Sequence, residues 1–154
     1  MAPSGREERG SEARGFTLIE LLVVIAIIGI LSYIILPSLF SARQQGNDAG
    51  VESDLETIKT QAEIYYTQNN NGYGTPGNSC ATAGSIFSDP TIMNAVAQIT
   101  QDANSATIAC NNASDAFAVQ ALLTAQGGTT YECMDSTGNP STSTTPLGTA
   151  TVCP

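Results

Sequence analysis

The chain has 154 residues, of which 42% are hydrophobic and only 12% are charged, and its formal net charge at pH 7 is −9. From Phe16 onward its only basic residues are Arg43 and Lys59. So acidic a chain is repelled by phosphate backbones, which argues against generic nucleic-acid binding, and no nucleic acid is expected among its partners.

Residues 1–15 form a short charged segment in which three arginines offset three glutamates. This segment has nothing to bury and resembles the polar start of an export signal. An ordinary signal peptide would lead to a cleavage site of small residues after its apolar part, and no such site follows here. We therefore expect the apolar segment to stay in the mature protein.

The run from Phe16 to Leu36 is almost wholly apolar. As a helix it would be about 30 Å long, which matches the hydrocarbon core of a bilayer. Glu20 stands out in it, because a charge at the centre of a bilayer costs at least ~2.5 kcal/mol. Snorkelling at the membrane edge is one explanation, since Glu20 lies only about 6 Å of helix rise from Phe16. A simple anchor accounts for the rest of the run.

After Pro37 the pattern becomes that of an amphipathic helix. Its apolar residues recur three and four apart, at Val51, Leu55, Ile58, Ala62 and Tyr65. The Asn and Gly residues at 69–74 favour a turn and predict the end of the helix. We expect one helix over residues 16–68, of which 16–36 spans a membrane or a filament core and 37–68 needs a small domain to cover its apolar face.

Residues 69–154 predict that small domain, which we call the head. A helix is expected from about Ser88 to Asp102, because Ser88 or Asp89 can cap it and Pro90 suits its first turn. Runs of apolar and β-branched residues predict strands at 107–110, 116–123 and 129–134.

Gly127 and Gly128 predict a hairpin between the last two of these strands. The alternation of Phe117, Val119 and Ala121 fits a sheet that packs one face on the long helix. Residues 136–149 are typical of a loop, and a short last strand is expected near 149–153. The predicted class is α+β.

Four cysteines, Cys80, Cys110, Cys133 and Cys153, all follow the apolar run. An even number in a small polar domain behind an export-type segment indicates disulfides and an oxidising compartment. Three connectivities are possible and sequence alone does not choose among them, although we favour the sequential pairs. The spacings are not those of a zinc site and the chain has no histidine, so no metal is expected.

The order Gly15, Phe16, Thr17, Leu18, Ile19, Glu20, followed by an apolar helix with Gly29 and Pro37, closely resembles the class III signal of type IV pilins and type II secretion pseudopilins. The resemblance is sharpest over residues 14–43. It implies the type IV pilin fold, with a long N-terminal α-helix and a small antiparallel β-sheet head stapled by disulfides.

The resemblance also assigns roles to matching positions. A prepilin peptidase would remove the leader, residues 1–15, by cutting after Gly15, and would methylate the new amine of Phe16. Glu20 would pair with the N-terminal amine of a neighbouring subunit, which makes an acid in the membrane much less costly. Gly29 and Pro37 weaken a helix and would let it loosen in the assembled filament.

The implied function is a main structural subunit of a type IV pilus. Its partners would be further copies of itself, the prepilin peptidase, the membrane and the pilus assembly platform. It would lie in the inner membrane before assembly and in an extracellular filament afterwards. Motility, adhesion and DNA uptake are not distinguished by the residues.

Two other functions stay open, a pseudopilin of a type II secretion system and a membrane-anchored binding module that does not polymerise. Some pseudopilin heads bind calcium in their last loop, where this chain has Asp135 and Asn139. An enzyme is not expected, because the chain has no histidine, nucleophile elbow or phosphate loop, and no catalytic residue or cofactor is predicted. Asn112 begins an N-glycosylation sequon.

Overall fold

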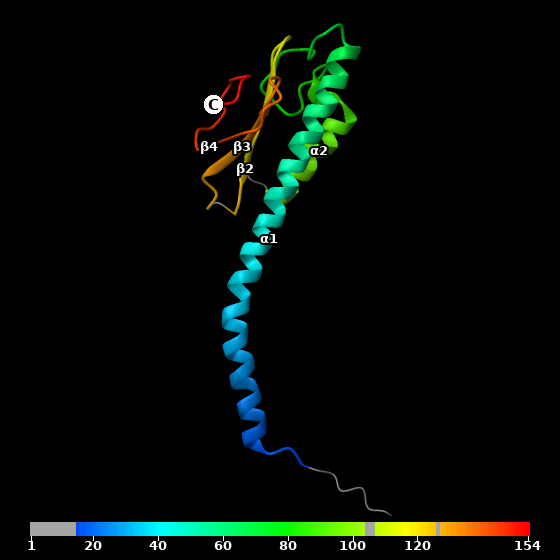
Figure 1. The fold of residues 1–154 in the computed structure, drawn as a ribbon. Coiled ribbons are helices and arrows are strands. Elements are labelled where there is room, and N and C mark those ends of the chain that lie inside the picture. Colours follow the sequence, from blue (N-terminus) through cyan, green and yellow to red (C-terminus); the bar gives the residue numbers. More distant parts are fainter. Residues whose placement is uncertain (1–14, 104–106, 126) are drawn as a thin grey trace, which may run out of the picture. The chain divides into compact units, whose positions relative to one another are not determined.

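The computed structural model describes residues 15–103, 107–125 and 127–154. It has a long helix, a short 3₁₀ turn, a second helix and an antiparallel sheet with strand order β1-β2-β3-β4 (Figure 1). This is the α+β class predicted from the sequence. The elements are α1 (Leu18–Gln68), η1 (Ile86–Ser88), α2 (Pro90–Asp102), β1 (Ile108–Asn112), β2 (Phe117–Leu123), β3 (Thr130–Asp135) and β4 (Ser141–Ser143).

The described residues fall into two compact units, which meet between Leu39 and Phe40. The second unit contains residues 69–154 together with the C-terminal part of α1, and the name head refers to this whole unit from here on. The helix begins two residues later than the expected Phe16 and ends at the expected Gln68. It ends where Asn70 and Asn71 adopt positive φ angles of 55° and 57°, a conformation that asparagine tolerates better than most residues.

The head has one main core between α1 and the sheet. Val51, Leu55, Ile58 and Ala62 are fully buried, as the amphipathic pattern predicts, and Tyr65 packs partly against them. Facing them is the inner face of the sheet, whose alternating residues in β2 are confirmed to be buried: Phe117, Val119, Ala121 and Leu123. The inner face of the sheet therefore shares one core with the long helix.

Helix α2 starts as the sequence predicts. The Asp89 carboxylate accepts hydrogen bonds from the backbone N–H groups of Thr91 (2.8 Å) and Ile92 (3.2 Å), and Pro90 occupies the first helical position. Ile92 and Ile99 are fully buried in the core. The alternative cap, Ser88, instead lies in η1.

Asp48 ties the sheet to α1, a contact that the sequence did not reveal. Its carboxylate is 7% exposed and accepts three hydrogen bonds from the end of β2. The donors are the Thr124 N–H (2.7 Å), the Thr124 hydroxyl (3.0 Å) and the Ala125 N–H (2.9 Å). These donors compensate for the loss of water around a buried acid that has no basic partner in the described part of the chain.

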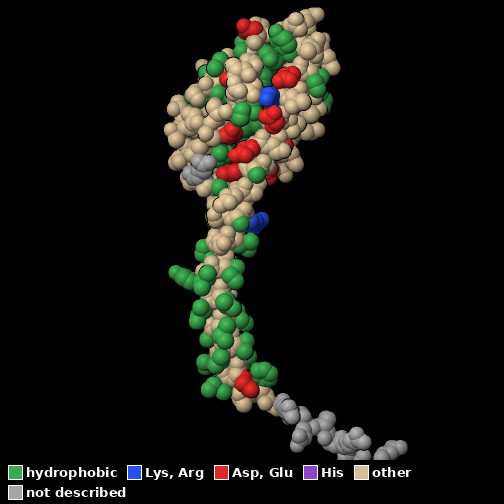
Figure 2. All heavy atoms as spheres, in the orientation of Figure 1, with side chains coloured by type: hydrophobic (Ala, Val, Ile, Leu, Met, Phe, Trp, Pro, Cys, Tyr) green, Lys and Arg blue, Asp and Glu red, His purple; other side chains and the backbone are tan. Residues whose placement is uncertain are grey.

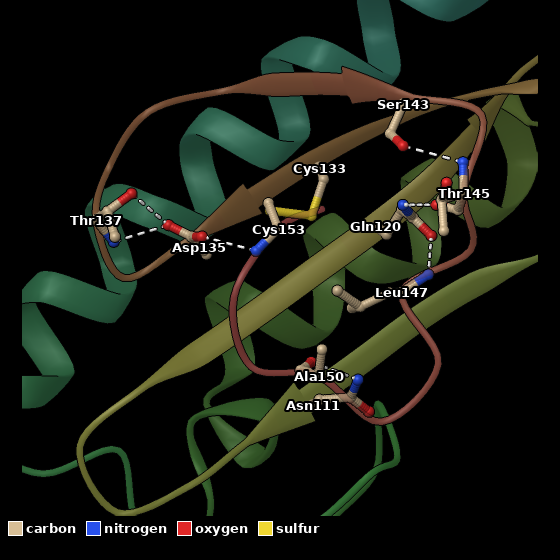
Figure 3. The surroundings of a disulfide bond; sticks show 10 residues. All are labelled: Asn111, Gln120, Cys133, Asp135, Thr137, Ser143, Thr145, Leu147, Ala150 and Cys153. Atoms are coloured by element: carbon tan, nitrogen blue, oxygen red, sulfur yellow. Dashed lines mark hydrogen bonds between the residues drawn. A yellow bond between two sulfur atoms is a disulfide. The ribbon is translucent and has the colours of Figure 1, made fainter.

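Two expectations for the C-terminal residues were wrong. Strand β4 forms inside the stretch 136–149 that was expected to be a loop, because Ser141–Ser143 pairs with the edge of β3. No strand forms at 149–153. Residues 144–154, which we call the strap, instead cross the outer face of the sheet, where side chains rather than a neighbouring strand bind their backbone groups (Figure 3).

Candidate assembly site

Glu20 closes a capping box at the start of α1. Its Oε2 accepts hydrogen bonds from the Thr17 N–H (2.8 Å) and the Thr17 hydroxyl (2.7 Å), while the Glu20 N–H donates to that hydroxyl oxygen (3.3 Å). A Ser or Thr followed three residues later by Glu satisfies orphan donors at a helix start in this way. Glu20 Oε1 has no hydrogen-bond partner among the described residues. Oε1 is therefore left without a hydrogen bond on an exposed side chain.

The surroundings of Glu20 are apolar and exposed. The large hydrophobic residues of Phe16–Phe40 each expose 46% or more of their surface, and Figure 2 shows hydrophobic side chains on all visible sides of this part of α1. Helix α1 is long and apolar enough to cross a membrane, with a mean hydropathy of 2.8 in its most apolar window, none of which is buried. So large an apolar surface requires a bilayer or other helices around it.

The other predicted residues of this segment lie where the sequence placed them. Gly15 and Phe16 precede the helix, and Phe16 is 81% exposed. Gly29 and Pro37 both lie inside α1, which is continuous through them in the isolated chain. Residues 1–14 of the leader lie outside the described residues.

The four cysteines form the two sequential pairs that we favoured from the sequence, Cys80–Cys110 and Cys133–Cys153. Their Cα atoms are 4.9 Å and 5.8 Å apart, which is ordinary disulfide geometry. The first bond joins the loop after α1 to β1. The second fastens the end of the strap to β3 (Figure 3).

Asn111 and Gln120 also hold the strap, although neither was predicted to have a role. Asn111 Nδ2 donates to the carbonyl oxygens of Gly148 (2.9 Å) and Ala150 (2.8 Å). Gln120 Nε2 donates to the carbonyl oxygen of Thr145 (3.0 Å), and Gln120 Oε1 accepts from the N–H of the buried Leu147 (2.6 Å). Both residues are 2% exposed. Their amides make the hydrogen bonds to the strap backbone that a neighbouring strand would otherwise make.

Asp135 completes this arrangement and bears on the calcium question. Its Oδ1 accepts from the Thr137 N–H (2.8 Å) and hydroxyl (2.6 Å), and its Oδ2 accepts from the Cys153 N–H (2.8 Å). Desolvation works against the charged form, but these hydrogen bonds outweigh it and hold the pKa of Asp135 below its usual value. Asn139 is exposed. Three of the roughly four lone-pair sites of this carboxylate are thus used inside the protein, and the described residues contain no group of three acids that could hold a calcium ion.

The sequon asparagine is also engaged inside the protein. Asn112 is 3% exposed, and its Nδ2 donates to the carbonyl oxygens of Tyr73 (3.2 Å) and Thr75 (2.9 Å). Since a glycan would be attached to this nitrogen, modification of the folded head is excluded at this residue.

Sequence reasoning missed several of these residues for different reasons. Thr17 was detectable, because Thr-x-x-Glu before an apolar run is the sequence signature of a capping box. Asp48, Asn111 and Gln120 carried no local signal, because polar residues at outward positions of a strand or helix usually face water.

Comparison with known proteins agrees with this geometry. Residues 11–35 match the family described as the prokaryotic N-terminal methylation motif. The chain is 48% identical over 58 residues to the type IV wide pilus major component PilA4 of Thermus thermophilus, but it spans only 44% of that protein. It is 33% identical over 108 residues to the type IV narrow pilus major component PilA5 of the same organism. These 108 residues are 70% of this chain and 86% of the relative.

A third relative is the type II secretion system core protein G of Pectobacterium carotovorum, 32% identical over 63 residues, which are 41% of this chain and 40% of the relative. No solved structure matches the chain. The relatives are structural pilin or pseudopilin subunits and not enzymes. The methylation motif, the extent of the match to PilA5 and the fold together show that this chain belongs to the type IV pilin family.

Proposed function

We propose that this protein is the main structural subunit of a type IV pilus. The observation that carries the proposal is Glu20, a carboxylate in an exposed apolar helix, inside the segment that matches the N-terminal methylation motif. In a simple anchor this acid would do no more than cap the helix. In a polymer it selects neighbours that bring a positive charge to the correct depth.

The capping box explains how Glu20 can do this. Thr17 occupies only Oε2 and fixes the rotamer of the acid, so that Oε1 stays available. Removal of the leader after Gly15 would create a cationic amine on Phe16, four residues before Glu20. The amine of one copy would then pair with Oε1 of another, which neutralises both charges as the helices pack together.

Gly29 and Pro37 would act in the same assembly step. Both residues weaken the helix, because Gly costs roughly 1 kcal/mol relative to Ala and Pro removes a backbone hydrogen bond. Loosening between them would let the apolar helices of neighbouring copies fit together. A filament whose helices stayed regular from Gly29 to Pro37 would contradict this step.

A pseudopilin is the second candidate, and the similarity to the type II secretion system core protein G favours it. The longer match to the major component of the narrow pilus supports a pilus instead. The strap also favours a pilus. Its Asp135 binds the backbone N–H groups of Thr137 and Cys153, whereas some pseudopilin heads hold calcium in this loop.

The decisive experiment is intact-mass measurement and N-terminal peptide mapping of the protein sheared from the surface of the native cell. We expect an abundant chain that starts at methylated Phe16 and contains both disulfides. Processed protein found only in the inner membrane would identify a pseudopilin. An uncut chain with residues 1–15 intact would contradict both functions and leave a membrane-anchored binding module.

A further inference from the structure

The two basic residues of the head differ in one respect. Lys59 lies 3.3 Å from Glu56 of its own helix. Arg43 is exposed and has no ion-pair partner within residues 15–103, 107–125 and 127–154. It lines a hollow of α1 that is completed by Phe40, Gln101 and other uncharged residues, so nothing in this surface neutralises it.

The opposite situation occurs on the β3 side of α1. Glu132 lies on the inner face of β3, opposite the buried Ala121, and is only 8% exposed. Burial raises the pKa of Glu132, and the charge of the exposed Glu52 on α1 raises it further. Neither acid has an ion-pair partner among the described residues. A nearly buried acid beside a second acid calls for a cation that this copy of the chain does not provide.

One chain cannot bring Arg43 to these acids. Arg43 and Glu52 are nine residues apart on α1, which is about 2.5 turns, so their side chains leave opposite sides of the helix about 13.5 Å apart along its axis. The Arg43 side is the one that faces the end of α2, whereas the Glu52 side faces β3. The two flanks of the head are therefore different from each other and opposite in charge at these points.

We infer that Arg43 of one copy binds the Glu52–Glu132 carboxylate pair of the next copy. Contact between two different flanks is heterologous, and repeated heterologous contacts produce open helical polymers. The inference rests on the proposed function in one respect, because it requires parallel copies side by side. It adds a contact between heads to the pairing of Glu20 within the apolar core.

An attractive contact between heads matters because each head carries many more acidic than basic residues. Residues 40–154 hold ten acidic and two basic residues, and Figure 2 shows acids gathered on one face. Such heads repel one another. Asp54 and Asp102 also lie on the α2 side. Asp54 is about 16 Å of helix rise from Arg43, and Asp102 lies against Gly50, which is about 10 Å of rise from Arg43. Both separations exceed one Debye length at physiological salt, about 8 Å. The attraction is thus local to the base of the head.

A charge swap tests the pairing in the native cell. We expect Arg43→Glu to lower the amount of sheared filament per processed subunit by about tenfold, because it places a repelling charge against the two acids. Glu52→Arg should lower it severalfold. The double variant with both changes should recover most of the wild-type yield, because the pair is restored with its charges exchanged. Lys59→Glu is the matched control and should have a smaller effect that Glu52→Arg does not reverse.

Cross-linking provides a readout that does not depend on filament export. Copies with Arg43→Cys and copies with Glu52→Cys are expressed together and treated with a short bismaleimide. We expect mixed dimers, and far fewer when Lys59→Cys replaces Arg43→Cys. Mixed dimers in a cell that exports no filament would support the contact while contradicting the pilus. Filaments that form normally, without mixed dimers and without rescue by the double variant, would overturn the contact alone.

Discussion

At the scale of single residues, Glu20 has two roles, one for each carboxylate oxygen, and mutations can separate them. It caps α1 through Oε2 and, in the proposed filament, pairs with an amine through Oε1. We predict that Glu20→Ala still inserts in the membrane and is processed, but yields at least about tenfold less filament, because the amine loses its partner. Sheared filament, measured against processed protein in the membrane, checks this.

Two variants define the cause. Glu63→Ala makes the same change at an exposed head residue and should leave the yield unchanged. Glu20→Gln keeps the size of the side chain and an oxygen that can accept from Thr17, but removes the charge. If Glu20→Gln assembled normally, the cap alone would explain the acid, and the charge pairing would be wrong.

At the scale of elements, the strap depends on ionised Asp135. We predict that Asp135→Asn lowers the free energy of unfolding at pH 7 by about 2 kcal/mol, since it weakens three hydrogen bonds to a charged group. The folded pKa is lowered, so this contribution is complete above the ordinary aspartate pKa of about 3.9 and is lost as pH falls through the folded value. Denaturant unfolding of the full chain in detergent at several pH values measures it.

Asp115→Asn is the control, because Asp115 is an exposed acid outside the strap. Its stability should match that of the wild type at every pH. Calcium and a chelator should leave the wild-type stability unchanged, because backbone N–H groups already bind Asp135. A stability loss in Asp135→Asn that persisted at acid pH would contradict the idea that ionised Asp135 holds the strap. A loss caused by the chelator would contradict it as well.

The elements that could be predicted are those with a local cause. Apolar spacing on α1, the Asp89–Pro90 start of α2 and the alternation in β2 each specify their structure within a few residues. The order from Gly15 to Glu20 likewise indicated the N-terminal methylation motif that the family comparison finds. These signals agree with one another, which is why the fold class followed from them.

The strap and β4 could not be predicted, because long-range contacts decide them. Ser141–Ser143 has little strand propensity of its own and becomes a strand because β3 offers it an open edge. The strap was expected to end in a strand, but Asn111 and Gln120 occupy its backbone groups from the sheet face. The register of β1 and β2 that brings these two side chains together is a property of the folded sheet.

At the scale of the whole molecule, acidity shapes both stability and assembly. The chain carries a net charge of −9, and its described part has one ion pair. Burial, with the charge of Asp102, raises the pKa of Asp54, just as burial and Glu52 raise that of Glu132. These acids oppose folding at neutral pH, whereas Asp135 supports it. The isolated subunit thus retains acids whose charge works against its own folding.

A substitution of Glu132 can measure the free energy that a buried charged acid costs the fold. We predict that Glu132→Gln raises the free energy of unfolding of the detergent-solubilised chain at pH 7 by about 1 kcal/mol, because an uncharged side chain avoids both desolvation and repulsion from Glu52. A raised folded pKa stabilises the fold fully below the ordinary glutamate pKa of about 4.3 and ceases to do so as pH rises through the folded value.

Wild type and Glu132→Gln should therefore be equally stable near pH 4 and diverge toward pH 7. Glu56→Gln is the matched control, because it neutralises an exposed acid that has Lys59 as its partner and should bring no gain. Thermal unfolding across this pH range distinguishes the two variants. A gain in Glu132→Gln of the same size at pH 4 would mean improved packing rather than relief of charge. A loss at pH 7 would mean that Glu132 is stabilised within its own chain, and the unmet negative charge on the β3 flank would have no basis.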